Sequence, residues 1–345
     1  MYTMKAYSEN SLWNVTPSEE PIQPTDILIR NTSTSTTIFS YIPRYEADVI
    51  VTGSFNIPPD TIDAAGITGT LSTRKFIVDG ITLQTESWSV PIDITRFDDA
   101  YELEQLAGND WFEGSSSLAV RDFIQGLGGI ETFKGYGDDS FGDFFYGGSG
   151  IDSAIFRGSY AQYKIEQVSD IWDYRTDANP RVSGFRITDQ TQNRDGIDNV
   201  NAVERLKFSD ISVALDSAKG ENAGDAYRLY KAAFDRAPDL EGLGFWIKQL
   251  DNGASLVNDA AQGFINSVEF TRMYGANPTD EAFVTLLYDH VLHRAAEGEG
   301  YQFWLHSLDV GVTRAQVLVD FANSAENINQ TTELIANGIQ FQEWP

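Results

Sequence analysis

The spacing of apolar and polar residues changes character along the chain. Residues 1–103 contain short alternating runs at 26–30, 48–51 and 75–78, separated by clusters of Ser, Thr and Pro. Alternation with a period of two is typical of β-strands that bury one face. From Asp225 onward, apolar residues recur at i, i+3, i+4 and i+7, which indicates amphipathic helices. The pattern therefore predicts a β-rich first part and a helical last part.

Between these two parts, acids and apolar residues return together with a period of 21 residues. Asp110, Glu131 and Asp152 form one series at this spacing, and Asp122 and Asp143 form a second. Successive acids are alternately 12 and 9 residues apart, and each is followed two places later by an apolar residue. These apolar residues are Phe112, Ile124, Phe133, Phe145 and Ala154. Short strands with one inward side chain per coil have this pattern, so we predict a parallel β-solenoid.

Stacked coils would place the acid of one coil over the acid of the next. Like charges at such a distance repel each other unless a cation lies between them. Calcium suits this position because it takes about six to eight oxygen ligands, from carboxylates and backbone carbonyls, in a flexible geometry. The pattern therefore predicts a calcium-binding solenoid, and a metal-free solenoid rich in Gly and Asp is the alternative.

One nonapeptide carries a resemblance to a known family. Residues 147–155 read Gly-Gly-Ser-Gly-Ile-Asp-Ser-Ala-Ile, which fits the nonapeptide of calcium-binding β-rolls with a small alanine at its apolar position. Residues 104–216 thus resemble the repeats-in-toxin, or hemolysin-type calcium-binding, family, and residues 195–210 look like the segment that closes many such rolls. The resemblance implies that turn carboxylates and glycine carbonyls bind Ca²⁺ between coils. The implied ligands are Asp110, Asp122, Glu131, Asp139, Asp143, Gly147, Gly148, Gly150 and Asp152.

The chain departs from that family in three ways. Its 12-residue half-coils are three residues too long, Glu131 stands in place of an aspartate, and few turns keep both glycines. We therefore expect fewer calcium ions than a regular array holds. Residues 48–53 repeat the acid-x-apolar-x-x-Gly signature, which predicts a decayed start of the solenoid in the first part.

The helical part contains an internal repeat at an offset of 58 residues, with copies at about residues 228–272 and 286–330. Tyr230, Arg236, Gly242, Phe245, Trp246, Leu250 and Gly253 return as Tyr288, Arg294, Gly300, Phe303, Trp304, Leu308 and Gly311. The doubled Arg-x₅-Gly-x₂-Phe-Trp motif resembles DUF4214, a helical module of unassigned chemistry often found beside repeats-in-toxin segments. We expect the aromatic pairs to lie in the core, and the two arginines to tie neighbouring helices together through carboxylates.

These patterns divide the chain into four segments. Residues 1–103 are the β-rich region, 104–216 the calcium-binding β-roll with capping strands, 217–224 a linker, and 225–345 the helical domain. The predicted fold class is an α+β multidomain protein. In it, an N-terminal β-rich region and a parallel β-roll precede an all-α domain made of two related helical repeats.

Composition narrows the classes of function. The chain has 51 acids against 24 Lys and Arg, a net charge of −27, and no basic patch, so nucleic-acid binding is not expected. The absence of cysteine excludes disulfides and thiolate zinc sites. No run of 18 apolar residues predicts a membrane span, and the first 30 residues lack the apolar core of a signal peptide. The family resemblance implies type I export, which reads an uncleaved C-terminal signal.

No catalytic constellation is evident. The three histidines, His290, His293 and His306, lie in the second helical copy, and no Gly-x-Ser-x-Gly elbow supports a catalytic triad. His290, His293 and Glu297 have the spacing of one helical face and could hold a metal, although exposed surface histidines have the same pattern. Paired carboxylates of a glycosidase leave no signature in sequence spacing. We expect a protein that is not an enzyme.

The sequence therefore predicts a calcium-binding structural protein of the extracellular space or cell surface. Its solenoid would become rigid on binding calcium outside the cell, because metal binding supplies folding free energy. Open strand edges would favour self-association into a layer, filament or matrix, or adhesion. One alternative is a virion component, such as a phage fibre or decoration protein. Another is a carbohydrate-binding accessory module of a secreted hydrolase, with a glycan as its partner.

Overall fold

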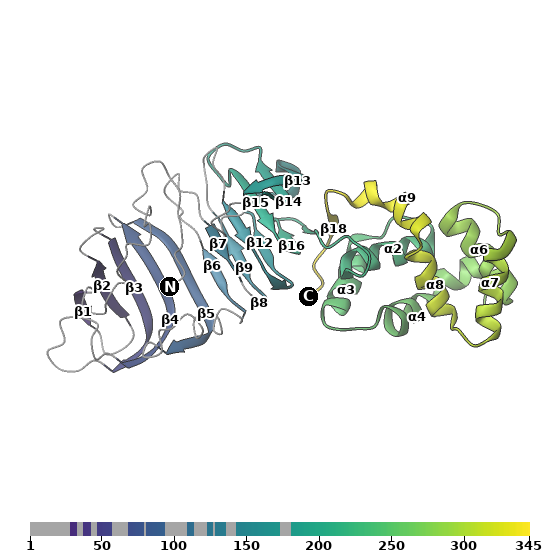
Figure 1. Ribbon diagram of the computed structural model, residues 1–345, viewed down its shortest axis with the longest axis horizontal. Helices are drawn as coiled ribbons and strands as arrows, with labels where there is room; N and C mark the ends of the chain where they lie inside the picture. The colour runs from purple at the N-terminus through teal and green to yellow at the C-terminus, as the bar shows by residue number, and fades with distance from the viewer. Residues whose placement is uncertain are drawn as a thin grey trace. The chain divides into compact units, whose positions relative to one another are not determined.

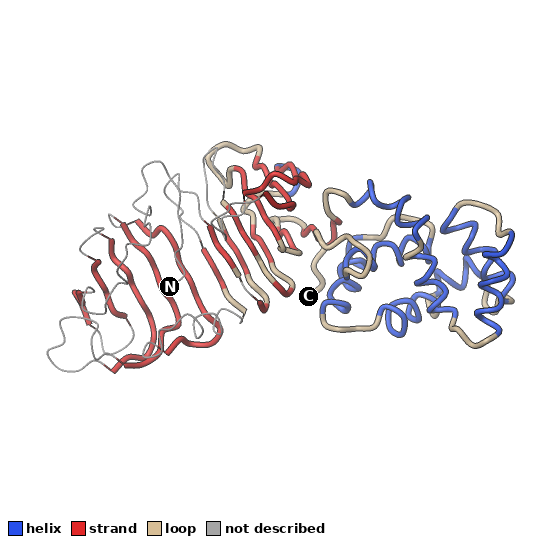
Figure 2. The backbone as a smooth tube through the Cα atoms, viewed as in Figure 1, coloured by secondary structure: helices blue, strands red, loops and turns tan. Residues whose placement is uncertain are grey.

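The computed structural model describes residues 28–32, 37–42, 47–56, 68–78, 81–93, 109–113, 123–126, 128–135, 143–172 and 181–345. It divides the chain into two units, Met1–Asp210 and Ile211–Pro345. The described part of the first unit is built of strands, and the second unit is mainly helical (Figure 1, Figure 2). The predicted β-rich first part and helical last part are therefore confirmed.

The first five strands form an antiparallel meander. They are β1 (Leu28–Thr32), β2 (Thr37–Ile42), β3 (Ala47–Asn56), β4 (Thr68–Val78) and β5 (Ile81–Asp93). Each pairs antiparallel with the next along the chain. The signature at residues 48–53 lies in β3, between antiparallel neighbours, and this arrangement differs from the parallel coils of the predicted decayed solenoid. Thr52 and Gly53 of β3 pair with Thr73 and Leu71 of β4, and the pairing leaves out Ser72, which indicates a β-bulge in β4.

Two parallel ladders follow the meander. The first consists of β6 (Trp111–Glu113), β9 (Thr132–Lys134), β12 (Ser153–Ile155) and β16 (Arg205–Lys207), and it continues the sheet from β5. The second consists of β7 (Phe123–Gln125), β10 (Phe144–Tyr146) and β15 (Ile197–Asn201). Two shorter strands, β8 (Gly128–Gly129) and β11 (Ser149–Gly150), also pair in parallel.

The 21-residue period of the sequence is the register of these ladders. Phe112 pairs with Phe133, and Phe133 pairs with Ala154, each 21 residues further on. Ring stacking fills the space inside: the Phe133 ring centroid lies 5.6 Å from that of Phe112 and 5.5 Å from that of Phe145. Because Phe145 belongs to the second ladder, the two ladders share one apolar interior.

An excursion interrupts the ladders between β12 and β16. A single 3₁₀ turn, η2 (Tyr160–Gln162), leads into the hairpin of β13 (Tyr163–Trp172) and β14 (Arg181–Asp189). Strand β14 then pairs antiparallel with β15, which joins the second ladder. Ala154 and its ladder partner Leu206 are consequently 52 residues apart instead of 21.

Asp195 closes this excursion. Its buried carboxylate accepts hydrogen bonds from Arg157 Nε at 2.6 Å and from the Tyr163 hydroxyl. Burial, together with this carboxylate, raises the pKa of Tyr163 above its ordinary value. The network joins the end of β12 to the returning chain, so the hairpin is held at both of its ends.

The helical unit repeats its elements at the predicted offset. The first copy consists of α2 (Asn222–Phe234), α3 (Leu240–Asp251), the π-helical turn η3 (Leu256–Ala261), α4 (Gln262–Ile265) and α5 (Val268–Tyr274). The second consists of α6 (Asp280–Leu292), α7 (Gly298–Asp309), α8 (Arg314–Ala322) and α9 (Ala325–Ile335). Two short strands, β17 (Ser212–Ala214) and β18 (Ile339–Phe341), pair antiparallel at the ends of the unit.

Equivalent aromatic residues form the core of each copy. Trp246 packs on Phe264 with a centroid distance of 5.3 Å, and Trp304 packs on Phe321 at 5.0 Å. Both phenylalanines belong to one buried apolar cluster that spans the two copies. The expectation that the aromatic pairs lie in the core holds only for their tryptophans, which pack against this cluster. It is wrong for the phenylalanine of the second pair, because Phe303 is 60% exposed.

Arg228 fixes the segment that precedes α2. This buried side chain donates hydrogen bonds to the backbone carbonyls of Ser217 and Ala218 and forms an ion pair with Asp225 at 2.8 Å. The residues predicted as a linker, 217–224, are thus ordered against the first helix, which begins inside them at Asn222.

Candidate functional site

A column of carboxylates follows the first parallel ladder. Its members are the acids two residues before each inward apolar residue, and we call them the first column: Asp110, Glu131, Asp152 and Glu204. The first three are buried, with exposed fractions of 3%, 0% and 0%. Burial follows from the register, because an acid two places before an inward residue in a strand points to the same side.

Hydrogen bonds between coils hold the column in place. Glu131 donates its backbone N–H to Asp152 Oδ1 at 2.8 Å, and Asp152 donates its N–H to Glu204 Oε2 at 2.9 Å. The coils are also joined through their backbones, since Ser153 N donates to the carbonyl of Glu131 at 2.8 Å. The carboxylates of Asp152 and Glu204 therefore each accept the amide of the acid one rung earlier, and the chain cannot change register without breaking these bonds.

Three oxygen atoms at the centre of this column lack a donor. Among the described residues, no N–H or O–H group donates to Glu131 Oε1, Glu131 Oε2 or Asp152 Oδ2, although all three atoms are buried. The carboxyl groups of Glu131 and Asp152 lie within hydrogen-bonding reach of each other, but two ionised carboxylates are both acceptors. A proton or a cation between them is needed for either group to be satisfied.

Burial is also the main cause of the pKa shifts at this pair. It raises the pKa of Glu131 to about 9, with smaller contributions from the carboxyl groups of Asp152, Asp110 and Glu204. The pKa of Asp152 is raised by burial as well, although the amide hydrogen bond from Glu131 acts in the opposite direction. In the absence of a cation, the pair holds a proton at neutral pH.

A shorter second column follows the other ladder and consists of Asp143 and Asp198. Asp143 donates its backbone N–H to Asp198 Oδ1 at 3.0 Å, and the two residues are 1% and 2% exposed. Asp122, the predicted first member of this series, lies outside the described residues, as does Asp139. The same rung-to-rung contact thus recurs on the second ladder.

Two glycines leave room for the carboxylates of the first column. A Cβ atom at Gly126 would lie 2.6 Å from Glu131 Cγ, and one at Gly147 would lie 2.3 Å from Asp152 Oδ2 and 2.0 Å from the carbonyl of Ala202. Real Cβ atoms do not approach other atoms so closely. Glycine is therefore required five residues before Glu131 and five residues before Asp152, because a larger side chain would collide there. Gly148 and Gly150 have a different role, because they adopt positive φ angles of 106° and 142° in the turn.

Sequence reasoning missed two members of the columns, Asp198 and Glu204. Both carry the same signature as the predicted acids, because Val200 follows Asp198 and Leu206 follows Glu204 two places later. The hairpin excursion breaks the 21-residue period before these rungs, so the spacing alone does not reveal them. The acid-x-apolar signature, searched without a fixed period, would have found both.

Other groups of possible ligands do not come together. His293 adopts a left-handed φ of 51° after the last residue of α6, so His290, His293 and Glu297 do not share one helical face. In the parts of the chain that the structure describes, no group of three or more His, Asp or Glu side chains is arranged to hold a metal ion. Binding of calcium to the columns stays a prediction.

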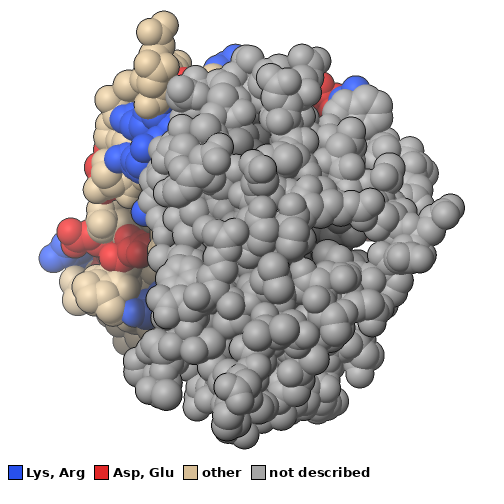
Figure 3. Space-filling model, turned by 90° about the vertical axis from the view of Figure 1, so that its left-hand side faces the viewer, with Lys and Arg blue, Asp and Glu red and all other residues tan. Residues whose placement is uncertain are grey.

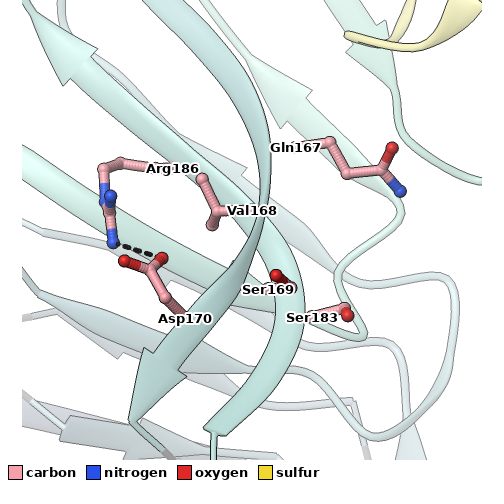
Figure 4. A pocket seen from close by; sticks show the side chains of 6 residues that line it. All are labelled: Gln167, Val168, Ser169, Asp170, Ser183 and Arg186. Carbon is pink, nitrogen blue, oxygen red and sulfur yellow. Dashed lines mark hydrogen bonds and ion pairs between the residues drawn. The ribbon is translucent and has the colours of Figure 1, made fainter.

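A shallow hollow of about 500 Å³ lies on the β13–β14 hairpin, where a bulge shifts the register between Val168 and Ile171. Its lining residues are Gln167, Val168, Ser169, Asp170, Ser183 and Arg186. Figure 4 shows Arg186 and Asp170 pointing toward each other, with an ion pair of 3.1 Å. None of the six lining side chains is aromatic.

At the left edge of the face drawn in Figure 3, described Lys and Arg residues lie near described Asp and Glu residues. None of the described helices is both long and apolar enough to cross a bilayer.

The repeated motif of the helical unit forms a clamp in each copy. Arg236 binds both carboxylate oxygens of Glu269 at 2.8 and 3.1 Å, and Arg294 binds those of Glu326 at 2.9 and 3.0 Å. The guanidinium of Arg294 also lies 4.8 Å from the ring centroid of Tyr288. Both arginines tie neighbouring helices together through a carboxylate, as the sequence predicted.

Comparison with known proteins identifies one part of the chain. No curated protein and no solved structure matches the chain. Residues 219–260 and 261–331 match the family model described as a domain of unknown function, DUF4214. The predicted resemblance is confirmed for this part: the helical unit carries a DUF4214 domain.

Proposed function

We propose that the chain is a calcium-binding structural protein of the extracellular medium or cell surface, and that residues 104–216 form a parallel β-roll stabilised by the ion. The observation that carries the proposal is the fully buried pair Glu131 and Asp152, with three carboxylate oxygens that lack a donor. The parallel register of the two ladders supports the β-roll.

The chemistry of the first column suits calcium. Its side-chain ligands are all carboxylate oxygens, which are hard donors, and Ca²⁺ accepts such ligands in irregular geometries. Magnesium demands a near-ideal octahedron and keeps several waters, and the enclosed space between Glu131 and Asp152 is poorly suited to that. These two residues would hold the ion, with Asp110 and Glu204 as neighbouring charges, and the ion would take the place of the proton that they otherwise share.

Calcium binding would couple the folding of the coils to the medium. A ligand that binds only the folded state adds RT ln(1 + [L]/Kd) to its stability. Even an affinity in the range of extracellular modules, with Kd of about 10⁻⁴ to 10⁻³ M, therefore stabilises the coils outside the cell and leaves them weaker in the cytosol. The net charge of −27 supports the same setting, because cations reduce its self-repulsion.

Thermal unfolding of the full chain tests this proposal. The unfolding transition of the β-rich unit should shift upward on addition of calcium over EGTA, and equimolar magnesium should produce little shift. The double variant Glu131→Gln with Asp152→Asn should lose most of the calcium shift. A matched control, Glu281→Gln with Glu333→Gln, removes two exposed acids of the helical unit and should keep it. Equal calcium shifts in the two double variants would remove the basis of the proposal.

A further inference from the structure

The last strand of the chain packs on the first DUF4214 copy, although it follows the second copy in sequence (Figure 1). Strand β18 comes directly after α9, and it pairs antiparallel with β17, which precedes α2. Ile339 and Phe341 of β18 are 3% and 4% exposed, and they belong to the same buried cluster as Leu243 and Ile247 of α3. The tail, residues 339–345, thus covers a surface formed by α3 and β17.

Backbone contacts hold the tail as an extended peptide. Gln342 N donates to the carbonyl of Leu240 at 3.0 Å, and Lys248 Nζ donates to the carbonyl of Trp344 at 3.1 Å. The Trp344 ring packs edge-on against Phe245 with a centroid distance of 5.3 Å. Strand pairing, a helix and an aromatic contact therefore bind the tail together, which is how extended peptides are recognised by strand addition.

One position of α3 is suited to the backbone of the tail. A Cβ atom on Gly244 would lie 1.8 Å from the carbonyl oxygen of Gln342, so this approach requires glycine. The equivalent residue of the second copy, at the offset of 58, is Gln302, and α7 has no fully buried residue. The first copy therefore has a binding surface for an extended chain that the second copy does not repeat.

A short connection carries the tail. Residues 336–338 join α9 to β18, and Gly338 adopts a positive φ of 98°. Gly338 N donates to the carbonyl of Ile335 at 3.1 Å, and this bond is lost if the connection opens. The tail of another chain can then make the same contacts with α3 and β17, because the two tails are identical. Exchange of an identical element is a low-cost route to dimers for this reason.

We infer that the surface of α3 and β17 is a docking site for the tail of a second copy of the chain, so that two chains exchange tails. The occupant is the segment that the structure shows on this surface. At low concentration each chain binds its own tail, because a short connection gives it an effective concentration of about millimolar. All contacts of the site lie within residues 211–345, so the inference does not rest on the calcium site.

Disulfide trapping tests the exchange, because the chain has no cysteine of its own. Val213 and Gln340 pair across β17 and β18, so cysteines at these positions can be bridged. Full-length Val213→Cys and Gln340→Cys chains, mixed in EGTA and oxidised, should form a covalent heterodimer whose yield rises with concentration. Peptide mapping should find the bond between positions 213 and 340. Neither chain can form this bond alone, so it reports the tail of one chain on β17 of the other.

A substitution in one chain at a time identifies the site. Gly244→Gln introduces the residue of α7, and in the Val213→Cys chain it should lower the heterodimer yield at least tenfold. In the Gln340→Cys chain the same change should keep or raise the yield, because that chain only donates its tail. Deletion of Asn337 in the Gln340→Cys chain should also raise the yield, because the shortened connection strains the closed form alone.

The double variant Val213→Cys with Gln340→Cys in one chain is the control for folding and geometry. At low concentration it should form the bond within a single chain. If it does, and the mixed single variants give no bond between positions 213 and 340 at any concentration, the inference is overturned. An equal yield with Gly244→Gln in either chain overturns it as well. Since calcium is absent, each result is separate from the calcium-dependent melting of the β-rich unit.

Discussion

Asp152 accepts the backbone N–H of Glu131, 21 residues earlier, at 2.8 Å, while the carboxyl groups of the same two residues lie within hydrogen-bonding reach of each other. One oxygen of Asp152 thus fixes the register of the coils. The remaining oxygens of the pair form a buried, negatively charged space. The contact between Glu131 and Asp152 therefore fixes the strand register and also requires a proton or a cation.

The stability of the β-rich unit should depend on pH when calcium is removed. The folded-state pKa of Glu131 is about 9, above its ordinary value of 4.5, so the folded chain retains a proton that the unfolded chain loses. The contribution of Glu131 to the free energy of unfolding is therefore largest below about pH 5 and falls as the pH rises toward 9. Melting temperatures in EGTA across this range should show the decline, and Glu131→Gln should flatten it. Identical profiles for the two proteins would contradict the assignment of the proton to this pair.

Calcium binding should release protons. At neutral pH the Glu131 and Asp152 pair holds a proton that the ion must displace, so about one proton should leave per ion bound at this site. Calorimetric titrations in buffers of different ionisation enthalpy measure this number. The release should decline as the pH approaches 9, because the proton is then already lost. Calcium binding without proton release at neutral pH would place the ion elsewhere.

Adding a methyl group at Gly147 should destabilise the β-rich unit. The new Cβ would collide with Asp152 Oδ2 and with the backbone of Ala202, and overpacking against backbone costs about 1–3 kcal/mol or more. Gly220→Ala serves as a comparison, because nothing lies within 4 Å of its added methyl and its positive φ alone costs about 1–2 kcal/mol. Urea unfolding of the variants measures both effects. A Gly147→Ala protein with wild-type stability would show that the column is less tightly packed.

The arginine clamps should contribute modestly to the stability of the helical unit. The side chains of Arg236 and Glu269 are 39% and 42% exposed, so solvent screens their attraction. A double-mutant cycle with Arg236→Ala and Glu269→Ala should give a coupling of about 0.2–1 kcal/mol. Arg236→Lys should lose much of this coupling, because an ammonium group cannot bind both carboxylate oxygens in the same plane. A coupling near zero would assign the recurrence of the motif to packing alone.

The sequence predicted the register of the parallel ladders where the 21-residue period is unbroken. The 21-residue spacing of Phe112, Phe133 and Ala154 gives the parallel register directly, because every coil adds the same length of chain. The hairpin of β13 and β14 could not be placed in the same way. It inserts 31 additional residues between Ala154 and Leu206, which removes the periodic signal just before Asp198 and Glu204 rejoin the columns.

The sequence pattern also could not predict that the acids are buried. A turn acid and an inward acid have the same spacing, and only the fold distinguishes a solvated Asp152 from one that is 0% exposed. In the helical unit the 58-residue offset predicted both clamps, since equivalent residues make equivalent contacts. The different cover of α3 and α7 depends on a C-terminal segment that has no counterpart in the repeat.

Equilibrium calcium binding, compared between the wild type and the Glu131→Gln, Asp152→Asn double variant, tests the central claim most directly. The account predicts that the wild-type chain binds calcium at millimolar or lower free concentration and that the variant binds at least one ion fewer. A wild type that binds no calcium in this range, or a variant that binds the same number of ions, would contradict it.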